Sequence, residues 1–175
     1  MAALHQTIFD SNSSLRITRQ RLLTHSYPNP DQKTAEILLW GYQSNKRGLV
    51  GNLLHQLAAV TAAASTNTTD WYTYYDSFKG SVSGANISTI TKFAYFHSRS
   101  FLGRKTGVAS PALILDNRLL AALPRWVEVD VPGLTRTTAR ARYVSYLARM
   151  EAVASSLRAT PDQLELFLFS SGHSY

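Results

Sequence analysis

The chain of 175 residues contains no cysteine. This absence excludes a disulfide framework, a thiolate zinc site, a cysteine nucleophile and a cysteine-ligated iron–sulfur cluster. The five histidines are scattered and show neither the HExxH spacing of a zinc hydrolase nor a neighbouring acidic pair. We therefore predict that the protein has no metal site.

Long hydrophobic runs are also missing. The most apolar stretch, residues 53–64, is interrupted by His55 and Gln56, and the N-terminus lacks the pattern of a signal peptide. We therefore expect no membrane segment and a cytoplasmic location, associated with the nucleoid if the protein binds DNA. Hydrophobic residues make up 45% of the chain and charged residues 17%, a composition typical of one globular domain rather than of disorder.

The positive charge is concentrated in one part of the chain. Eighteen Lys and Arg residues outnumber eleven Asp and Glu residues, and the whole excess of +7 lies between Lys92 and Arg158. An excess gathered in this way favours a polyanionic partner, and DNA first, because Lys and Arg neutralise phosphates without regard to base sequence. A solvated basic face, or one that meets an acidic protein, is the alternative.

Hydrophobic periodicity predicts an all-α fold that covers residues 1–175 as a single helical domain. Residues 1–30 are expected to form an N-terminal arm or a short helix, which ends at the prolines of positions 28 and 30. Helical spacing continues through residues 31–40, 49–64, 70–78, 87–97, 117–123 and 135–158, with a short last helix from about residue 160. Residues 101–110 are expected to be a basic connection, and no strand pair is predicted.

Two of these helices are joined by a small-residue turn at residues 80–85. Such a unit offers backbone N–H groups to a DNA phosphate. Lys92 follows the turn, and Asp116 ends the apolar run 111–115 and begins another helix. An amine of this kind can attack the sugar carbon of an extruded nucleotide, while a carboxylate stabilises positive charge on the sugar or assists proton transfer.

These residues resemble helix-hairpin-helix DNA glycosylases of the 8-oxoguanine DNA glycosylase type, in particular the compact bacterial ones. The likeness is carried by Thr91-Lys92-Phe93-Ala94, by Leu113-Ile114-Leu115-Asp116-Asn117-Arg118 and by the closing run at residues 164–169. It covers residues 78–169, with the hairpin and the catalytic loop at 78–123. The resemblance implies that Lys92 displaces the base and forms a Schiff base, that strand cleavage by β-elimination follows, and that Asp116 is the essential acid.

The resemblance also implies a substrate and a set of contacts. The substrate is double-stranded DNA with a damaged or modified base, 8-oxoguanine by default; no cofactor is needed, and we expect a monomer. Gly84, Ser88, Arg99, Arg104, Lys105 and Arg118 are the predicted DNA contacts, and Trp40, Tyr42 and Phe169 the predicted base pocket. Only Gly84 lies close before Lys92, and the spacing from Lys92 to Asp116 is longer than usual, which keeps a phage-type modified base open as the substrate.

Plainer interpretations of the same residues stay open. On a helical wheel Lys92 lies opposite the apolar face of residues 87–101, as an ordinary solvent-exposed lysine does. Asp116 is equally well explained as an N-cap, the aromatic residues as core, and His97 as a packing residue. The rival function is a non-catalytic helix-hairpin-helix module that only binds DNA.

Overall fold

The computed structural model describes residues 17–41, 47–103 and 107–171. Its elements, in chain order, are α2 (Arg19–Thr24), α3 (Pro30–Gly41), α4 (Arg47–His55), α5 (Leu57–Ala64), α6 (Trp71–Ser81), α7 (Ile87–Phe96), β1 (Ser100–Leu102), β2 (Ala109–Pro111), α8 (Asn117–Ala122), the 3-10 helix η1 (Leu123–Arg125), α9 (Ala139–Ser156) and α10 (Pro161–Ser171). The predicted helical fold class is confirmed. None of the described helices is long and apolar enough to cross a membrane.

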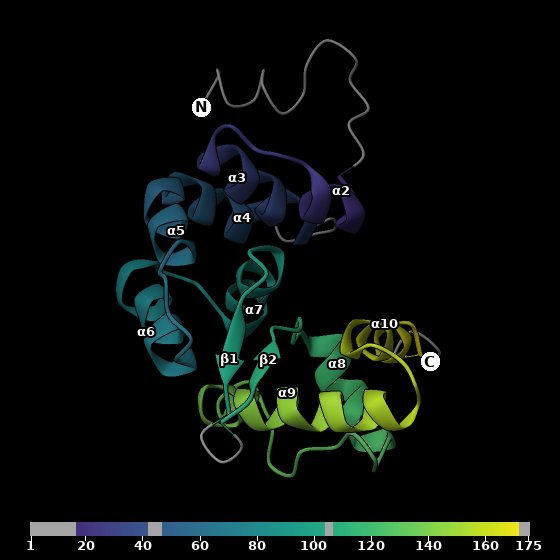
Figure 1. Cartoon of the computed structure of the whole chain (residues 1–175). Coiled ribbons are helices and arrows are strands. Elements are labelled where there is room, and N and C mark those ends of the chain that lie inside the picture. The colour runs from purple at the N-terminus through teal and green to yellow at the C-terminus, as the bar shows by residue number, and fades with distance from the viewer. Residues whose placement is uncertain (1–16, 42–46, 104–106, 172–175) are drawn as a thin grey trace.

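Helix α7 lies between two groups of helices (Figure 1). Helices α2 to α4 lie on one side of α7, and α8 to α10 lie on the other, with the strands β1 and β2 between α7 and α9. Helix α7 packs on α3 and α5, while α10 packs on both α8 and α9. The chain thus passes from the first group of helices to the second immediately after α7.

Nine of the ten residues of α7 are buried. Asn86 caps the helix at its N-terminus, where its side chain accepts a hydrogen bond from the Thr89 amide at 3.0 Å. Lys92 is only 8% exposed. The alternative interpretation of Lys92 as an ordinary solvent-exposed lysine is therefore wrong, because a helical wheel assumes one covered face whereas α7 is covered on all sides.

The aromatic segment after residue 70 forms part of the core, as predicted. Trp71, Tyr74 and Phe78 of α6 are at most 1% exposed. The Trp71 ring lies 4.2 Å from that of Tyr143 in α9 and 5.2 Å from that of Phe101 in β1, measured between centroids. Aromatic pairs at these separations add attraction to the gain from burial. The core therefore ties α6 to α9 through the strand pair.

Two predictions about secondary structure are wrong. Residues 101–110 are not a plain connection, since β1 and β2 pair antiparallel with Phe101 opposite Ser110. Strands of three residues are too short to show alternation in the sequence. The predicted helix 49–64 is divided at Gln56, whose side-chain amide donates to the Ser83 carbonyl at 3.1 Å and accepts from the Ser83 amide at 2.8 Å. Gln56 thereby holds the turn before α7.

The N-terminal segment is a short helix docked on α3. Residues 1–16 of the predicted arm lie outside the described residues. In α2, Arg21 pairs with the fully buried Glu36 at 3.0 Å, and Tyr27 and Gln32 also donate to that carboxylate. Burial raises the pKa of Glu36, but these hydrogen bonds outweigh burial, and the pKa lies below its ordinary value.

A pH-dependent contribution to stability follows from His97. Its Nε2 atom is buried and has no hydrogen-bond partner among the described residues. Burial lowers the pKa of His97 to about 4, helped by the charges of Lys33 and Arg99. The unfolded chain therefore binds a proton between pH 6.5 and 4 that the folded protein does not, so the free energy of unfolding falls as the pH falls through this window.

We predict that in His97→Phe the free energy of unfolding falls less steeply as the pH is lowered, by up to about 1 kcal/mol per pH unit. The measurement is urea unfolding at pH values from 7 to 4, compared with wild type, with exposed His55→Phe as the control. Equal slopes for His97→Phe and wild type would show that His97 titrates normally in the fold.

Candidate active site

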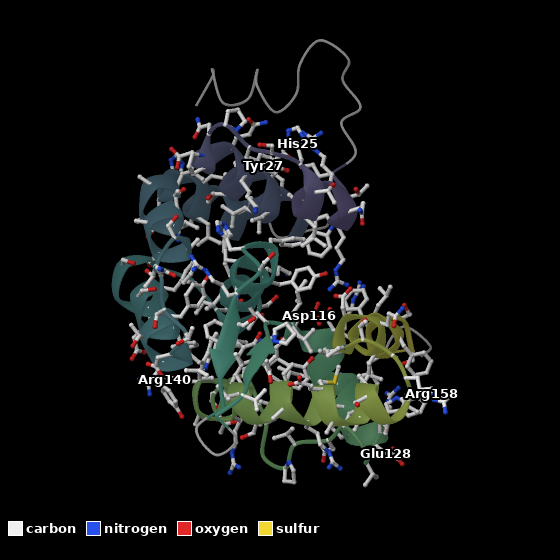
Figure 2. The ribbon with its side chains drawn as sticks, in the orientation of Figure 1. His25, Tyr27, Asp116, Glu128, Arg140 and Arg158 are labelled. Carbon is white, nitrogen blue, oxygen red and sulfur yellow. The ribbon has the colours of Figure 1, made fainter. Side chains whose placement is uncertain are left out.

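Lys92 and Asp116 line one pocket of about 820 Å³. The volume is in the range of pockets that take small organic ligands. The other lining residues come mostly from the ends of helices: Arg19, Trp40, Gly41, Tyr75, Lys79, Ala85, Asn86, Ile87, Ser88, Ile114, Asn117, Arg118, Arg136, Glu165, Leu166 and Phe169. Figure 2 shows Asp116 near the middle of the molecule, whereas Arg140, Glu128 and Arg158 lie at its edge.

The amine of Lys92 is held by two acceptors. Its Nζ atom donates to Ser88 Oγ at 2.9 Å and to the carbonyl oxygen of Gly41 at 3.3 Å. Gly41 is the last residue of α3, and a Cβ at this position would meet Lys92 Cδ at 3.1 Å and Nζ at 3.3 Å. A methyl group at this position would require the lysine side chain to move by a few tenths of an ångström.

Asp116 is the N-cap of α8, as the sequence predicted. Its Oδ1 atom accepts from the amides of Arg118 and Leu119, both at 3.0 Å. Such a cap contributes on the order of 1 kcal/mol to stability. Both bonds use the same oxygen of the carboxylate, so capping by Asp116 and a role in the pocket are compatible.

The turn before α7 has the conformation that its small residues allow. Gly84 has a φ of +81°, a left-handed conformation that glycine adopts without strain. Lys79 at the end of α6 donates to the Ala85 carbonyl at 3.1 Å. Of the two residues predicted to contact DNA here, Gly84 shapes the turn, and Ser88 lies in the pocket wall as a partner of Lys92.

The charged lining of the pocket is mainly cationic. Five cations line it, Arg19, Lys79, Lys92, Arg118 and Arg136, against the carboxylates Asp116 and Glu165. Arg19 and Lys79 were missed because they come from the part of the chain whose charges balance. The Arg118 guanidinium lies over the Phe169 ring, 5.2 Å from its centroid. The pocket therefore favours an anionic or electron-rich ligand.

The other predicted DNA contacts are not all brought to the pocket. Arg99 instead donates to the Ala64 carbonyl at 3.1 Å and lies over the Tyr74 ring. Arg104 and Lys105 lie outside the described residues, as does Tyr42. Trp40 and Phe169 of the predicted base pocket do line the cavity, together with Tyr75, which no feature of the sequence singled out.

Glu165 is the pocket residue that sequence reasoning overlooked most. It is only 3% exposed, and it is the one charged residue of the run at 164–169. Burial raises the pKa of Glu165 to about 7, and the attraction of Arg19, whose Nη2 atom lies 2.9 Å from Oε1, opposes that rise. A single carboxylate within an apolar run is the signal that could have identified this position.

A comparison with protein families identifies the family of the chain. A family model described as "Putative 8-oxoguanine DNA glycosylase OGG-like protein" matches residues 2–169. The chain belongs to this family. No curated protein and no solved structure matches the chain. The resemblance that residues 78–169 carried is thereby confirmed, and the match extends it to the N-terminal half.

The arrangement suits reactions at an electrophilic carbon. A buried amine with defined acceptors lies in one pocket with a carboxylate, and cations surround both. An amine can act as a nucleophile, and a carboxylate in the same site can transfer a proton or stabilise positive charge. In the described part of the chain, no group of three or more His, Asp or Glu side chains is placed to hold a metal ion.

The contact of Gly41 with Lys92 yields a prediction about stability. We expect Gly41→Ala to lower the free energy of unfolding by about 1 kcal/mol or more, because the new methyl group overpacks the lysine side chain. In a Lys92→Ala background the same change should be neutral or stabilising, since the methyl group fills vacated space. Urea unfolding of the four proteins of this double-mutant cycle measures the coupling.

Gly51→Ala in α4 is the matched control, because a Cβ at Gly51 meets nothing within 4 Å. It should be neutral or stabilising by up to about 1 kcal/mol, as replacement of a helical glycine usually is. The close approach would be disproved if Gly41→Ala behaved like Gly51→Ala in both backgrounds.

Proposed function

We propose that the protein is a DNA glycosylase that takes an extruded damaged or modified base into this pocket and releases it through Lys92 and Asp116. The observation that carries the proposal is the buried amine of Lys92 in the same cationic pocket as Asp116. Membership of the glycosylase-like family supports it. Oxidised purines such as 8-oxoguanine are the first substrates to test, and a phage-type modified base is the second.

The reaction begins with the uncharged amine of Lys92. Its nitrogen attacks C1′ of the extruded nucleotide, and the bond from C1′ to the base breaks. The base leaves with the electron pair and takes up the proton that the attacking nitrogen loses. Asp116 stabilises the positive charge that develops on the sugar, or transfers a proton. Ser88 and Gly41 aim the amine through the hydrogen bonds at 2.9 and 3.3 Å.

Opening of the sugar ring then leaves a Schiff base between Lys92 and C1′. Loss of a proton from C2′ breaks the bond from C3′ to its phosphate oxygen, and the strand is cleaved by β-elimination. Water finally releases the lysine. This lyase step makes the protein bifunctional and needs no cofactor, and its covalent intermediate can be reduced and trapped.

The walls of the pocket suit a bent DNA strand. An extruded nucleotide brings its own phosphates to the pocket, and Lys79, Arg118 and Arg136 of the lining can neutralise them. The N-terminus of α7 and the turn at Gly84 offer backbone N–H groups to a further phosphate. Trp40, Tyr75 and Phe169 supply faces on which a base stacks. A monomer that works on DNA in the cytoplasm or nucleoid stays a prediction.

Borohydride trapping on duplex DNA tests the nucleophile. We expect wild-type protein to form a reduced covalent adduct on duplexes with 8-oxoguanine, and Lys92→Ala to form none. Asp116→Asn should slow base release by about 100-fold or more, the usual contribution of a group that assists proton transfer. Lys33→Ala, at a half-buried lysine outside the pocket lining, is the control and should trap like wild type.

Three other outcomes separate the rival interpretations. Base release without an adduct indicates a glycosylase that uses water. Trapping that persists in Lys92→Ala disproves the assigned nucleophile. Tight DNA binding with neither base release nor trapping, on oxidised, modified or abasic duplexes, indicates a non-catalytic DNA-binding module.

The cationic wall predicts a salt dependence of DNA binding. We expect Arg136→Ala to reduce the slope of log K against log salt by about 0.9, the value for one lost phosphate contact. Arg149→Ala is the control, because Arg149 is also exposed but does not line this pocket. Fluorescence anisotropy at several salt concentrations measures both slopes, and equal losses for the two variants would count against this orientation of the DNA.

A further inference from the structure

Residues 112–116, which lead from β2 to Asp116, belong to no helix or strand. Three successive amides of this segment are nevertheless satisfied, each by a side chain from a different helix. Leu113 donates to Tyr143 Oη of α9 at 3.0 Å, Ile114 to Glu165 Oε2 of α10 at 2.7 Å, and Leu115 to Thr91 Oγ1 of α7 at 3.0 Å. Side-chain oxygens therefore accept the backbone N–H groups of this segment, as the carbonyl groups of a neighbouring strand do in a sheet.

The third of these bonds joins the immediate neighbours of the two residues to which we assign the chemistry. Thr91 directly precedes Lys92 in α7, and Leu115 directly precedes Asp116. The Thr91 hydroxyl also donates to the Ile87 carbonyl at 2.8 Å, which fixes its orientation. The bond from Leu115 to Thr91 thus fixes the backbone before Asp116 next to the helix that carries Lys92. The bonds of the Leu113 and Ile114 amides set the direction of the segment.

Glu165 differs from the other two acceptors because it is a buried carboxylate. Its second oxygen, Oε1, accepts from Arg19 Nη2 at 2.9 Å. Arg19 also donates to Asp162 at 2.9 Å and, through Nε, to the hydroxyl of Tyr95 at 2.8 Å. A buried ion pair adds little net stability compared with apolar residues of the same volume. The Arg19 side chain is 21% exposed and that of Glu165 is 4% exposed, so Glu165 is the buried partner, and its Oε2 atom accepts from the Ile114 amide.

A charged acceptor binds an amide more strongly and at shorter distance than a neutral one. The bond from the Ile114 amide, at 2.7 Å, is the shortest of the three amide bonds. Arg19 supplies the opposite charge that favours the ionised form of Glu165 against the effect of burial. Arg19 and Glu165 both line the pocket, so the ion pair lies at the same pocket as Asp116 rather than in a remote part of the core.

We propose that Glu165 is a positioning residue for Asp116: paired with Arg19, it holds the Ile114 amide and so sets where the Asp116 carboxylate lies relative to Lys92. What Asp116 then does rests on the proposed function. The placement itself does not, and it is measurable without any activity.

Amide hydrogen exchange tests the placement. Glu165→Leu removes the acceptor and fills the volume, and we expect the Ile114 amide to exchange at least 10-fold faster. If Glu165 positions Asp116, the amides of Arg118 and Leu119, which bind Asp116 Oδ1, also exchange faster. Asp162→Leu is the matched control: it removes another partner of Arg19 but no contact with the segment, and these amides should keep their wild-type rates.

Faster exchange at Ile114 alone, with Arg118 and Leu119 unchanged, would overturn the proposal, because the effect would not reach Asp116. Glu165→Gln is the second variant and conserves the shape of the side chain. Its amide oxygen still accepts from Ile114, so exchange at Arg118 and Leu119 should return most of the way to wild type. A Gln variant with rates as fast as those of Leu also contradicts the proposal.

Single-turnover base release tests the consequence. We expect Glu165→Leu to slow release by about 10- to 100-fold, as a displaced catalytic group does, with the DNA dissociation constant changed less than threefold. In an Asp116→Asn background the same change should cost nothing further, because Glu165 acts through Asp116. A purely structural residue would slow release equally in both backgrounds or weaken DNA binding in parallel.

Different results would contradict the glycosylase function and the positioning role of Glu165. If wild type releases no base from any duplex tested while exchange responds as expected, the proposed function fails and the placement of Asp116 by Glu165 stands. If wild type is active and Glu165→Leu releases base equally fast, the glycosylase function stands and the positioning role fails.

Discussion

The burial of helix α7 on all sides is the constraint on which the rest of the structure depends. A helix satisfies its own backbone hydrogen bonds, so it can pass through the middle of the molecule without exposing polar groups to an apolar core. Its one lysine reaches solvent only through the pocket, so most of its hydrogen-bond partners must come from the protein. Ser88 Oγ and the Gly41 carbonyl supply them, and the amine is held at 8% exposure in the wall of the pocket.

The pocket is made from ends of helices because α7 itself is covered. The end of α3 brings Gly41, the start of α7 brings Ser88, and the start of α8 brings Asp116. Helix ends carry unpaired backbone groups and partial charges, so they suit a charged ligand better than the apolar sides of helices do. The ion pair of Arg19 and Glu165 joins α2 to α10 at the same pocket, and so ties the two ends of the described chain to the site.

Much of the site was predictable because its signals are local. The small-residue turn, the N-cap at Asp116 and the motif around Lys92 each lie within a few residues of sequence. Other features depend on contacts between distant residues and left no local signal. Arg19 contacts Glu165 across 146 positions of the sequence. Nothing in the sequence sets Arg99 apart from the other arginines of the basic stretch, but in the structure it donates a hydrogen bond to the Ala64 carbonyl.

The sequence by itself determined the helical class, the turn before α7, the cap of α8 and membership of the glycosylase-like family, since periodicity, capping and motifs are properties of neighbouring residues. Only the tertiary structure decided that Lys92 is buried, that Glu165 holds the segment before Asp116, and which arginines face the pocket. Burial and long-range hydrogen bonds depend on which helices cover each face, and that is settled when the helices pack together.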